Sequence, residues 1–308
     1  MLKKKKVAII ILNWNSYNDT YECLKSLESL DYSNYQVFLV DNDSQDNSYY
    51  YLKKDYDEGN FCIPITFIQT GANLGFAGGN NVAIKKAYEQ GYEYIWLLNN
   101  DTVVKSNALT PLVETMESDN IVGIVGSKIL YYNTNKIWFA GGKINNLIGT
   151  PKHIGINEED INRHNSIKEV DYITGCSLLI RRSVIEKIGL MDEHYFLYFE
   201  ETDWNIRAKQ FGFKILFNPQ SIIWHKVSQS TSNNDSFNYI VYYYSIRNNI
   251  YLIKKYYSKQ VLISFLSFSF IRAIKTWIKN KCDLNILKYS YLGIVDGMKK
   301  NMGNFNKR

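Results

Sequence analysis

Residues 95–102 read Ile-Trp-Leu-Leu-Asn-Asn-Asp-Thr, an apolar run that stops at two amides and a single carboxylate, Asp101. An uninterrupted apolar run of this length predicts a strand that is buried on both faces. Open α/β sheets bind their ligands beyond the carboxyl ends of such strands. The stretch therefore predicts a metal or phosphate ligand, Asp101, at the carboxyl end of a buried strand.

Three earlier segments repeat this pattern. Residues 7–12, 35–40 and 65–69 are apolar runs, and each is followed by Asn or Asp side chains. Helical or mixed segments separate the runs, which predicts a mainly parallel sheet flanked by helices, with right-handed crossovers. The polar side chains after the strands should then meet at one edge of the sheet, where we expect the ligand site.

The second half of this region is less regular. We expect a helix at residues 107–117, a strand at 121–131, and a loop or hairpin at 141–165. Apolar spacing predicts a further helix at residues 201–211, whose first turn carries three acids, Glu200, Glu201 and Asp203. Free amides and the dipole favour carboxylates at a helix N-terminus, so plain capping also explains these acids.

Composition divides the chain of 308 residues in two. Hydrophobic residues at 45% and charged residues at 21% are ordinary globular values. The net charge of +6 is uneven, because residues 239–308 hold 13 Lys and Arg against two acids, Asp283 and Asp296. We therefore predict a catalytic domain over residues 1–238 and a helical, basic and aromatic extension over residues 239–308.

The basic extension is expected to contact an anionic membrane surface. Its uncharged run, residues 260–271, has only 12 residues. A spanning helix needs about 20, so we expect this segment to lie on a bilayer without crossing it. Four widely spaced cysteines without a Cys-x-x-Cys pair indicate reduced, mostly core thiols, and no cleavage site follows the apolar run at residues 7–12. These features predict a cytoplasmic protein, peripheral on the inner face of the cell membrane.

A lone acid at a strand end and a cluster of acids at a later helix suit nucleotide-sugar chemistry. A divalent cation there neutralises the diphosphate leaving group, and a separate carboxylate takes a proton from the attacking hydroxyl. His225, which follows a short apolar strand, is the candidate second ligand for Mn²⁺ or Mg²⁺, although a hydrogen-bonded core histidine is the alternative. The glycine-rich residues 75–81 match neither the Rossmann nor the P-loop spacing and remain a weak phosphate motif.

Six motifs together resemble a known family. They are Ile-Ile-Leu-Asn-Trp-Asn-Ser, Val-Asp-Asn-Asp-Ser-Gln-Asp, Asn-Leu-Gly-Phe-Ala-Gly-Gly-Asn-Asn, Leu-Leu-Asn-Asn-Asp-Thr, Thr-Gly-Cys-Ser-Leu-Leu-Ile-Arg-Arg and Tyr-Phe-Glu-Glu-Thr-Asp-Trp. Their order is similar to that of family 2 glycosyltransferases of the GT-A fold, an α/β fold for nucleotide-diphospho-sugars. The chain looks most like the bacterial rhamnosyltransferase branch that builds surface polysaccharides.

The resemblance implies a role for each matching residue. Asp101 and His225 would bind the metal, and Glu201 would be the general base, with Glu200 and Asp203 as its acceptor-side neighbours. The donor nucleotide-sugar would be held by Asn13, Asn15, Asp41, Asn42, Asn73, Gly75, Asn80, Asn99 and Asn100. Two residues depart from the pattern, because Asn99 replaces the first acid of Asp-x-Asp and Glu201 stands where the branch usually has Asp.

By this resemblance the protein is an inverting, metal-dependent enzyme that moves a sugar, rhamnose from dTDP-rhamnose, onto a lipid-linked oligosaccharide or polysaccharide. A UDP-hexose donor is the nearest alternative. A nucleotidyltransferase would carry a glycine-rich loop with a basic residue after its first strand, and none follows residues 7–12. A non-catalytic nucleic-acid binder could use the basic extension, but we expect no nucleic-acid partner.

Overall fold

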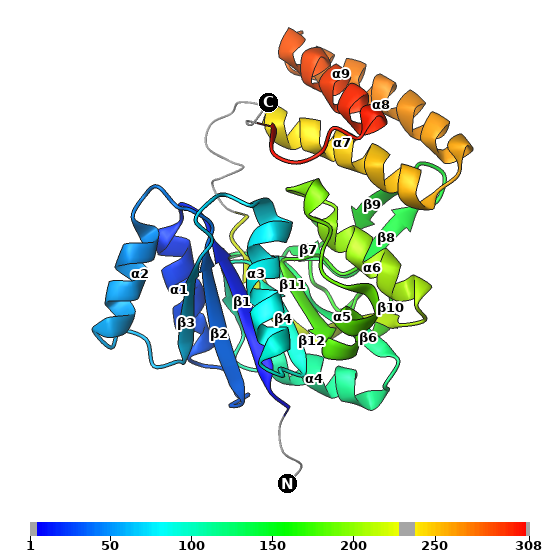
Figure 1. The fold of residues 1–308 in the computed structure, drawn as a ribbon. Helices are drawn as coiled ribbons and strands as arrows, with labels where there is room; N and C mark the ends of the chain where they lie inside the picture. Colours follow the sequence, from blue (N-terminus) through cyan, green and yellow to red (C-terminus); the bar gives the residue numbers. More distant parts are fainter. Residues whose placement is uncertain (1–4, 228–237, 306–308) are drawn as a thin grey trace.

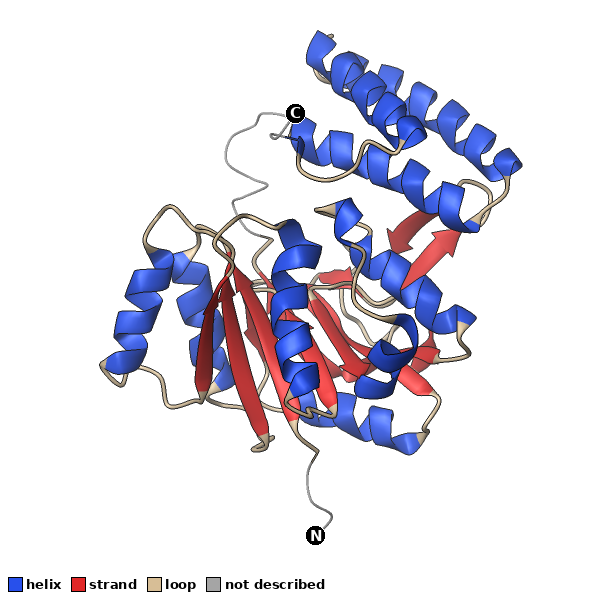
Figure 2. Ribbon diagram, in the orientation of Figure 1, coloured by secondary structure: helices blue, strands red, loops and turns tan. Residues whose placement is uncertain are grey.

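The computed structural model describes residues 5–227 and 238–305 of the chain. Its centre is a ten-stranded mixed sheet with helices on both faces (Figure 1, Figure 2). Helices α3, α5 and α6 lie in front of the sheet in Figure 2, and α1 lies behind it. The main strand order is β10-β12-β6-β11-β4-β1-β2-β3, and β5 and β7 pair at the side with β12 and β6.

The first half of the sheet is parallel, as the apolar runs predict. The strands are β1 (Val7–Asn13), β2 (Tyr35–Asp41), β3 (Ile65–Gln69) and β4 (Tyr94–Leu98). The bounds of β3 and β4 are those predicted, whereas β1 and β2 each extend one residue further. Asn13 and Asp41 are therefore the last residues of their strands, and they are partners in the parallel register.

The second half of the sheet is mixed. Strand β11 (Ser177–Arg181) runs antiparallel between β4 and β6 (Val122–Tyr131), and β12 (Lys214–His225) is parallel to β6. The short strands are β5 (Thr102–Val104), β7 (Ile137–Phe139) and β10 (Lys168–Glu169), each antiparallel to its neighbour. Because β11 enters between two earlier strands, it brings the residues that precede it to the carboxyl end of β4.

The helices include those predicted and one that was missed. They are α1 (Tyr17–Leu27), α2 (Ser48–Asp57), α3 (Gly75–Glu89), α4 (Leu109–Ser118), α5 (Arg182–Ile188) and α6 (Glu200–Gln210), with a 3₁₀ turn at Glu193–Tyr195. Helix α2 was not predicted, since it buries only Ser48 and Leu52 and so lacks a broad apolar face. The hairpin expected within residues 141–165 is confirmed as β8 (Gly142–Asn145) and β9 (Thr150–His153).

Three helices form the extension, α7 (Tyr239–Tyr256), α8 (Lys259–Lys279) and α9 (Leu284–Lys299). They enclose an apolar cluster of their own, which includes Ile246, Ile250, Phe265 and Ile286. In Figure 1 they lie above the carboxyl ends of the parallel strands, on the side opposite the N-terminus. The predicted boundary between residues 238 and 239 stays a prediction, because residues 228–237 lie outside the described chain.

Helix α8 corrects one prediction about the membrane. It is 21 residues long, and by length and composition it could cross a membrane. The argument that residues 260–271 are too short to cross was wrong, because the helix continues through Arg272 and Lys275 as far as Lys279. Length alone does not separate a spanning helix from one that lies on a surface.

The cysteines also differ in part from expectation. Cys23 and Cys176 are buried, as predicted for core thiols, but Cys62 and Cys282 are exposed. All four are free thiols.

Candidate active site

Side chains from three strand ends share one hydrogen-bond network. The Asn13 amide donates to the Asp41 carboxylate at 2.8 Å and to the Ser48 hydroxyl at 2.7 Å. The Thr20 hydroxyl donates to Asn13 Oδ1 at 2.8 Å, and the Asn100 amide donates to Thr20 at 2.9 Å. The carboxyl ends of β2, β1 and β4 are thus linked in that order, so the structure brings three predicted nucleotide-site residues, Asn13, Asp41 and Asn100, to one place.

The loop before α3 forms the next part of the edge. The Asn42 amide donates to Asn73 Oδ1 and to the Gly75 carbonyl, both at 3.2 Å, and Asn42 Oδ1 accepts the Leu74 N–H at 3.0 Å. Gly75 has φ of +73°, and a Cβ there would lie 2.2 Å from the Phe196 carbonyl oxygen. Only glycine fits this position.

Two of the predicted nucleotide-site side chains bond to nearby backbone. Asn15 is exposed, and its Oδ1 accepts the Gln45 N–H at 2.6 Å. Its own N–H donates to the Ser44 hydroxyl at 2.9 Å, which also accepts the Asn13 amide at 3.2 Å. The Asn80 side chain is buried, and its amide donates to the Phe76 carbonyl of its own helix at 2.9 Å. The structure therefore uses both side chains to fix the local backbone.

The two predicted metal ligands are neighbours because of strand pairing. Strand β5 begins just after Asp101, and it pairs with the end of β12 so that Thr102 is opposite His225. This register places His225 Nε2 3.1 Å from Asp101 Oδ1, and both side chains are almost buried, at 8% and 10% exposure. Sequence alone gives no sign that these strands pair.

The pair offers two side chains that could hold one divalent cation, because carboxylate oxygen and imidazole nitrogen suit Mn²⁺. No group of three or more His, Cys, Asp and Glu side chains that could hold a metal occurs in the described residues. Diphosphate oxygens of a donor and water would then complete the shell.

The acids of α6 lie in a separate position. Glu200 is buried, and Glu201 is partly exposed to solvent but surrounded by protein. Burial raises the pKa of Glu201 to about 7. Burial, and then the nearby Glu201, raise the pKa of Glu200 well above its ordinary value. A carboxyl whose pKa lies near neutrality is suited to accept a proton in a reaction.

Asp203 does not lie beside these two acids. Residues two apart on a helix point about 200° apart, so Asp203 faces away from Glu201. Asp203 is fully buried, and its carboxylate accepts a hydrogen bond from the Arg207 guanidinium at 2.8 Å. It also pairs with Lys255 and accepts a hydrogen bond from the Tyr256 hydroxyl, both of α7. The predicted acceptor-side position is therefore wrong, and Asp203 joins α6 to the extension.

The segment before β11 contacts both the Asp101 loop and the Glu201 helix. The Asn99 N–H donates to the Cys176 carbonyl at 3.0 Å. A Cβ on Gly175 would be 3.8 Å from the Glu201 Cβ. Residues 174–176 thus contact the Asp101 loop on one side and the Glu201 helix on the other. This segment therefore links the loop that carries Asp101 to the helix that carries Glu201.

Several residues of this region were not singled out from the sequence. The Trp138 ring lies 4.5 Å from the His225 ring and 4.5 Å from the His153 ring, and burial lowers the pKa of His153 to about 4. Tyr172 is buried, and burial raises the pKa of its hydroxyl. The nearby Glu201 raises the pKa of Tyr172 further. Gly175 belongs to a quoted motif, but nothing in the sequence pattern distinguishes Trp138 or Tyr172.

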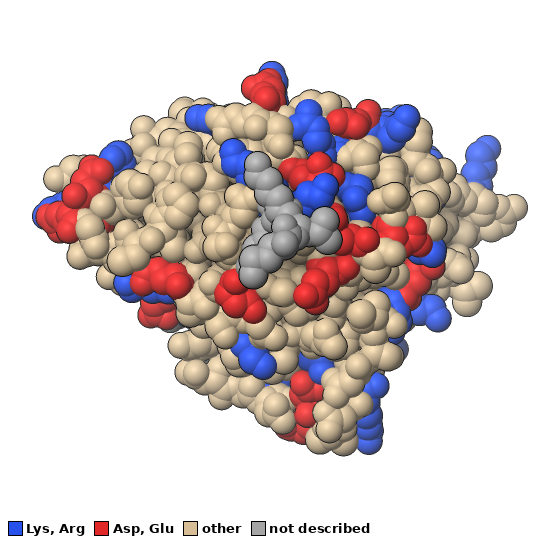
Figure 3. Space-filling model, turned by 90° about the horizontal axis from the view of Figure 1, so that it is seen from below, with Lys and Arg blue, Asp and Glu red and all other residues tan. Residues whose placement is uncertain are grey.

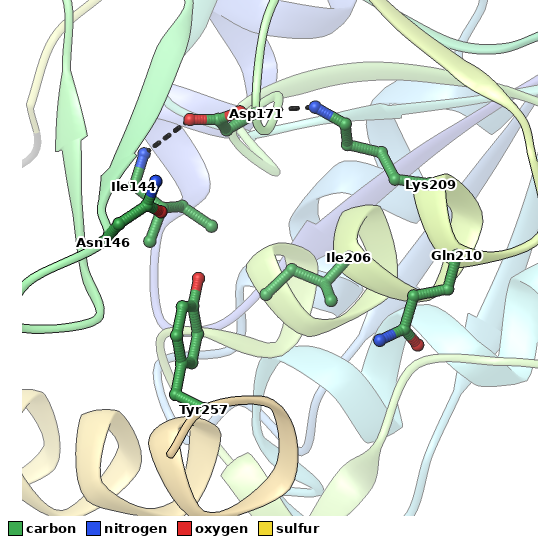
Figure 4. A pocket seen from close by; sticks show the side chains of 7 residues that line it. All are labelled: Ile144, Asn146, Asp171, Ile206, Lys209, Gln210 and Tyr257. Carbon is green, nitrogen blue, oxygen red and sulfur yellow. Dashed lines mark hydrogen bonds and ion pairs between the residues drawn. The ribbon is translucent and has the colours of Figure 1, made fainter. Parts of the chain in front are cut away.

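A cavity of about 290 Å³ lies away from these acids (Figure 4). None of the predicted site residues lines it. Its carboxylate, Asp171, accepts the Ile144 N–H at 2.9 Å and pairs with Lys209 at 3.3 Å, and Tyr257 closes one side. Because these charges are already paired, we give this cavity no catalytic role.

The fold and the two acidic positions define a glycosyltransferase of the GT-A fold. A mannosyltransferase from Pyrobaculum calidifontis, PcManGT, solved with GDP-Man and Mn²⁺, has the same fold with a TM-score of 0.61 and 12% identity. The similarity covers 97% of this chain and 88% of that protein. The GT-A expectation from the sequence is confirmed.

The chain belongs to glycosyl transferase family 2, whose profile matches residues 8–189. A curated relative, the low-salt glycan biosynthesis hexosyltransferase Agl10 of Haloferax volcanii, is 27% identical over 66% of this chain and 62% of its own length. The dTDP-rhamnosyl transferase RfbF of Shigella flexneri is 24% identical over 76% of this chain and 79% of its own length. The chain thus spans less than two thirds of the first of these relatives.

Proposed function

We propose that this protein is an inverting, metal-dependent glycosyltransferase that moves rhamnose from dTDP-rhamnose onto a lipid-linked oligosaccharide or polysaccharide. One observation carries the proposal, namely that residues 174–176 contact both the loop that carries Asp101 and the helix that carries Glu201. A donor bound along this segment would present its diphosphate to the Asp101–His225 pair and its anomeric carbon toward Glu201. The similarity to RfbF supports rhamnose, and the similarity to Agl10 keeps a hexose donor as the alternative.

The residues divide the reaction between them. Asp101 and His225 would hold Mn²⁺ or Mg²⁺, which when bound offsets the negative charge that develops on the departing diphosphate. Glu201 accepts the proton of the acceptor hydroxyl as that oxygen attacks the anomeric carbon. Direct attack from the face opposite the leaving group inverts the configuration of the sugar.

The two departures from the family pattern leave this chemistry possible. Asn99 is neutral, so a cation would be held by one carboxylate, Asp101, together with the imidazole of His225. Glu201 is one methylene longer than Asp, and it carries the same carboxylate at the start of α6.

The exposed face of α8 supports a membrane-bound acceptor. The helix packs through Phe265, Ser269 and Ala273, and its opposite side exposes Ile263, Phe270 and Ile278 by 60–64%. At 100° per residue these three side chains form one stripe. Lys275 and Lys279 are exposed on one side of the stripe, an arrangement typical of helices that lie in an anionic headgroup layer, whereas Arg272 lies over the Tyr242 ring of α7. We therefore propose a cytoplasmic enzyme that is peripheral on the membrane.

The face on the side of the N-terminus does not favour a nucleic-acid partner. Figure 3 shows the face on the side of the N-terminus, where acidic and basic side chains are interspersed. A phosphate backbone binds best to a continuous basic surface, and this face does not offer one.

The test is a panel of nucleotide-sugars incubated with the enzyme, Mn²⁺ or Mg²⁺, and lipid-linked acceptors. Release of nucleoside diphosphate and the anomeric configuration of the product are measured. We expect acceptor-dependent release from dTDP-rhamnose and an inverted product. Glu201→Gln should lower turnover by about 100-fold or more with little change in donor KM. Turnover retained in this variant, or a retained anomeric configuration, would contradict the proposal.

A further inference from the structure

The loop just before the proposed base has an unusual backbone. Phe196, Tyr198 and Phe199 have φ of +65°, +70° and +76°, and none of them is glycine. Such conformations cost on the order of 1–3 kcal/mol each and persist only where the surroundings impose them. Because Phe199 directly precedes Glu200 and Glu201, whatever holds this loop also sets where α6 begins.

Asn248 of α7 holds this loop. Its side-chain amide donates to the carbonyls of Tyr195 at 3.1 Å, Leu197 at 2.7 Å and Tyr198 at 2.9 Å. The side chain is fully buried, and its Oδ1 accepts Arg247 Nε at 2.8 Å. A single amide from the extension therefore fixes three carbonyls of the loop.

Arg247 strengthens the same contact. It is also fully buried, and its guanidinium donates to the Tyr195 carbonyl at 2.8 Å and to the Gly303 carbonyl at 2.6 Å. Its bond to Asn248 orients the Asn248 side chain, so that the amide nitrogen points to the loop and the amide oxygen does not.

The same loop also contacts the proposed donor pocket. The Phe196 carbonyl accepts the Phe76 N–H at 2.7 Å, and the neighbouring Gly75 packs directly against it. The Gly75 carbonyl in turn accepts the Asn42 amide. One side of the loop is thus fixed by the donor pocket and the other by α7.

A second contact from α7 holds the first turn of α6. Lys255 pairs with Asp203 and, at 2.9 Å, with Asp192, and the Tyr256 hydroxyl donates to Asp203 at 2.8 Å. Since Asp203 lies opposite Glu201 on the helix, this pairing limits rotation of α6 about its axis. The extension therefore contacts the base-bearing helix at its start and on its back.

We propose that Asn248 is a positioning residue for the transfer reaction, which acts by fixing residues 195–199 and through them the Glu201 carboxylate. The inference rests on the proposed role of Glu201 as general base. Asn248 bonds to carbonyls of the loop that precedes Glu201, so its effect on the base is indirect. A displacement of about 1 Å at a reacting group can cost about 100-fold in rate.

The test compares Asn248→Ala and Asn248→Asp with Asn249→Ala in the full chain. Asp has the size of Asn but cannot donate to three carbonyls, so it removes the loop contact. Asn249 is the matched control, because it is equally buried on the same helix but donates to Thr150 of the hairpin, at 2.8 Å. Donor KM, kcat, the pH profile and thermal unfolding are measured for each variant.

For both Asn248 variants we expect kcat to fall by about 30- to 100-fold with donor KM within about three-fold, while Asn249→Ala keeps kcat within about three-fold. Glu201 faces Glu200, Tyr198 and Tyr172. Looser packing in the Asn248 variants should let water reach Glu201 and lower its pKa, so the rising limb of the pH profile should move to lower pH. If Asn248→Asp does not fold, Asn248→Ala carries the comparison. Equal losses in the Asn248 and Asn249 variants of matched stability, or a loss confined to donor KM, would overturn the inference.

The Glu201→Gln variant separates this inference from the proposed function. If Glu201→Gln is inactive and Asn248→Ala is fully active, Glu201 is still supported as the general base, but the positioning role of Asn248 is refuted. If Glu201→Gln is active, the proposed role of Glu201 as general base is itself refuted.

Discussion

The raised pKa of Glu201 makes the pH dependence of transfer a sharp test of its role. A general base works only when it is ionised. Burial raises the pKa of Glu201 from 4.5 to about 7, so its ionised fraction changes across the neutral range. The rate should therefore rise with pH through this pKa, with the slope of a single ionisation.

The size of the effect follows from the pKa. With a pKa of about 7, about one tenth of the enzyme is ionised at pH 6 and about nine tenths at pH 8. We expect kcat/KM to fall about ten-fold between pH 8 and pH 6. A glutamate of ordinary pKa would be ionised at both values, and the rate would hardly change.

The assay measures the initial rate of nucleoside diphosphate release between pH 5.5 and 8.5, at saturating Mn²⁺. Glu200→Gln is the matched control. Burial, and then the nearby Glu201, raise the pKa of Glu200 well above its ordinary value. An amide in its place removes this second carboxyl and leaves Glu201 buried as before, so the rising limb of the profile should stay near pH 7. A flat profile in the wild-type enzyme from pH 6 to pH 8 would refute this account of the base.

Three further predictions follow from the ion pairs and the exposed helix. Asp101→Asn should raise donor KM, lower kcat and weaken stimulation by Mn²⁺, whereas Glu201→Gln should lower kcat alone. Measuring the rate of each variant as a function of Mn²⁺ concentration checks this. Asp203→Asn should destabilise the fold by about 1–3 kcal/mol in urea unfolding, since it removes the buried carboxylate that pairs with the partly exposed Arg207 and Lys255, of which Lys255 keeps Asp192; a loss within experimental error would contradict this pairing. Phe270→Glu should reduce sedimentation with anionic vesicles and leave turnover on a water-soluble acceptor unchanged, and unaltered vesicle binding would argue against α8 as the contact.

Much of the parallel half of the sheet could be predicted from sequence, because local patterns determine it. Strand β4 is an uninterrupted apolar run followed by polar residues, and β3 is a mostly apolar run whose predicted limits agree with the structure. The polar residues Asn13, Asp41 and Asn100 meet because parallel strands end at one edge. No distant contact is needed for these inferences.

The remainder depends on pairing between segments far apart in the chain. The sequence does not show that β11 inserts antiparallel between β4 and β6, or that β5 pairs with β12 and so joins Asp101 to His225. Asp203 was misplaced for a related reason, since its partners Lys255 and Tyr256 are some 50 residues away. An acid at a helix start has the same local pattern whether it faces a substrate or a distant helix.

The hydrogen bonds from α7 to residues 195–199 affect when the protein becomes active during its synthesis. Domains generally fold from the N-terminus as they leave the ribosome. The strands that bind the donor would be complete before Asn248 is made, but the base would not yet be fixed. We therefore expect a nascent chain able to retain nucleotide yet slow to turn it over, so that little activated sugar is wasted before the membrane-facing helices exist.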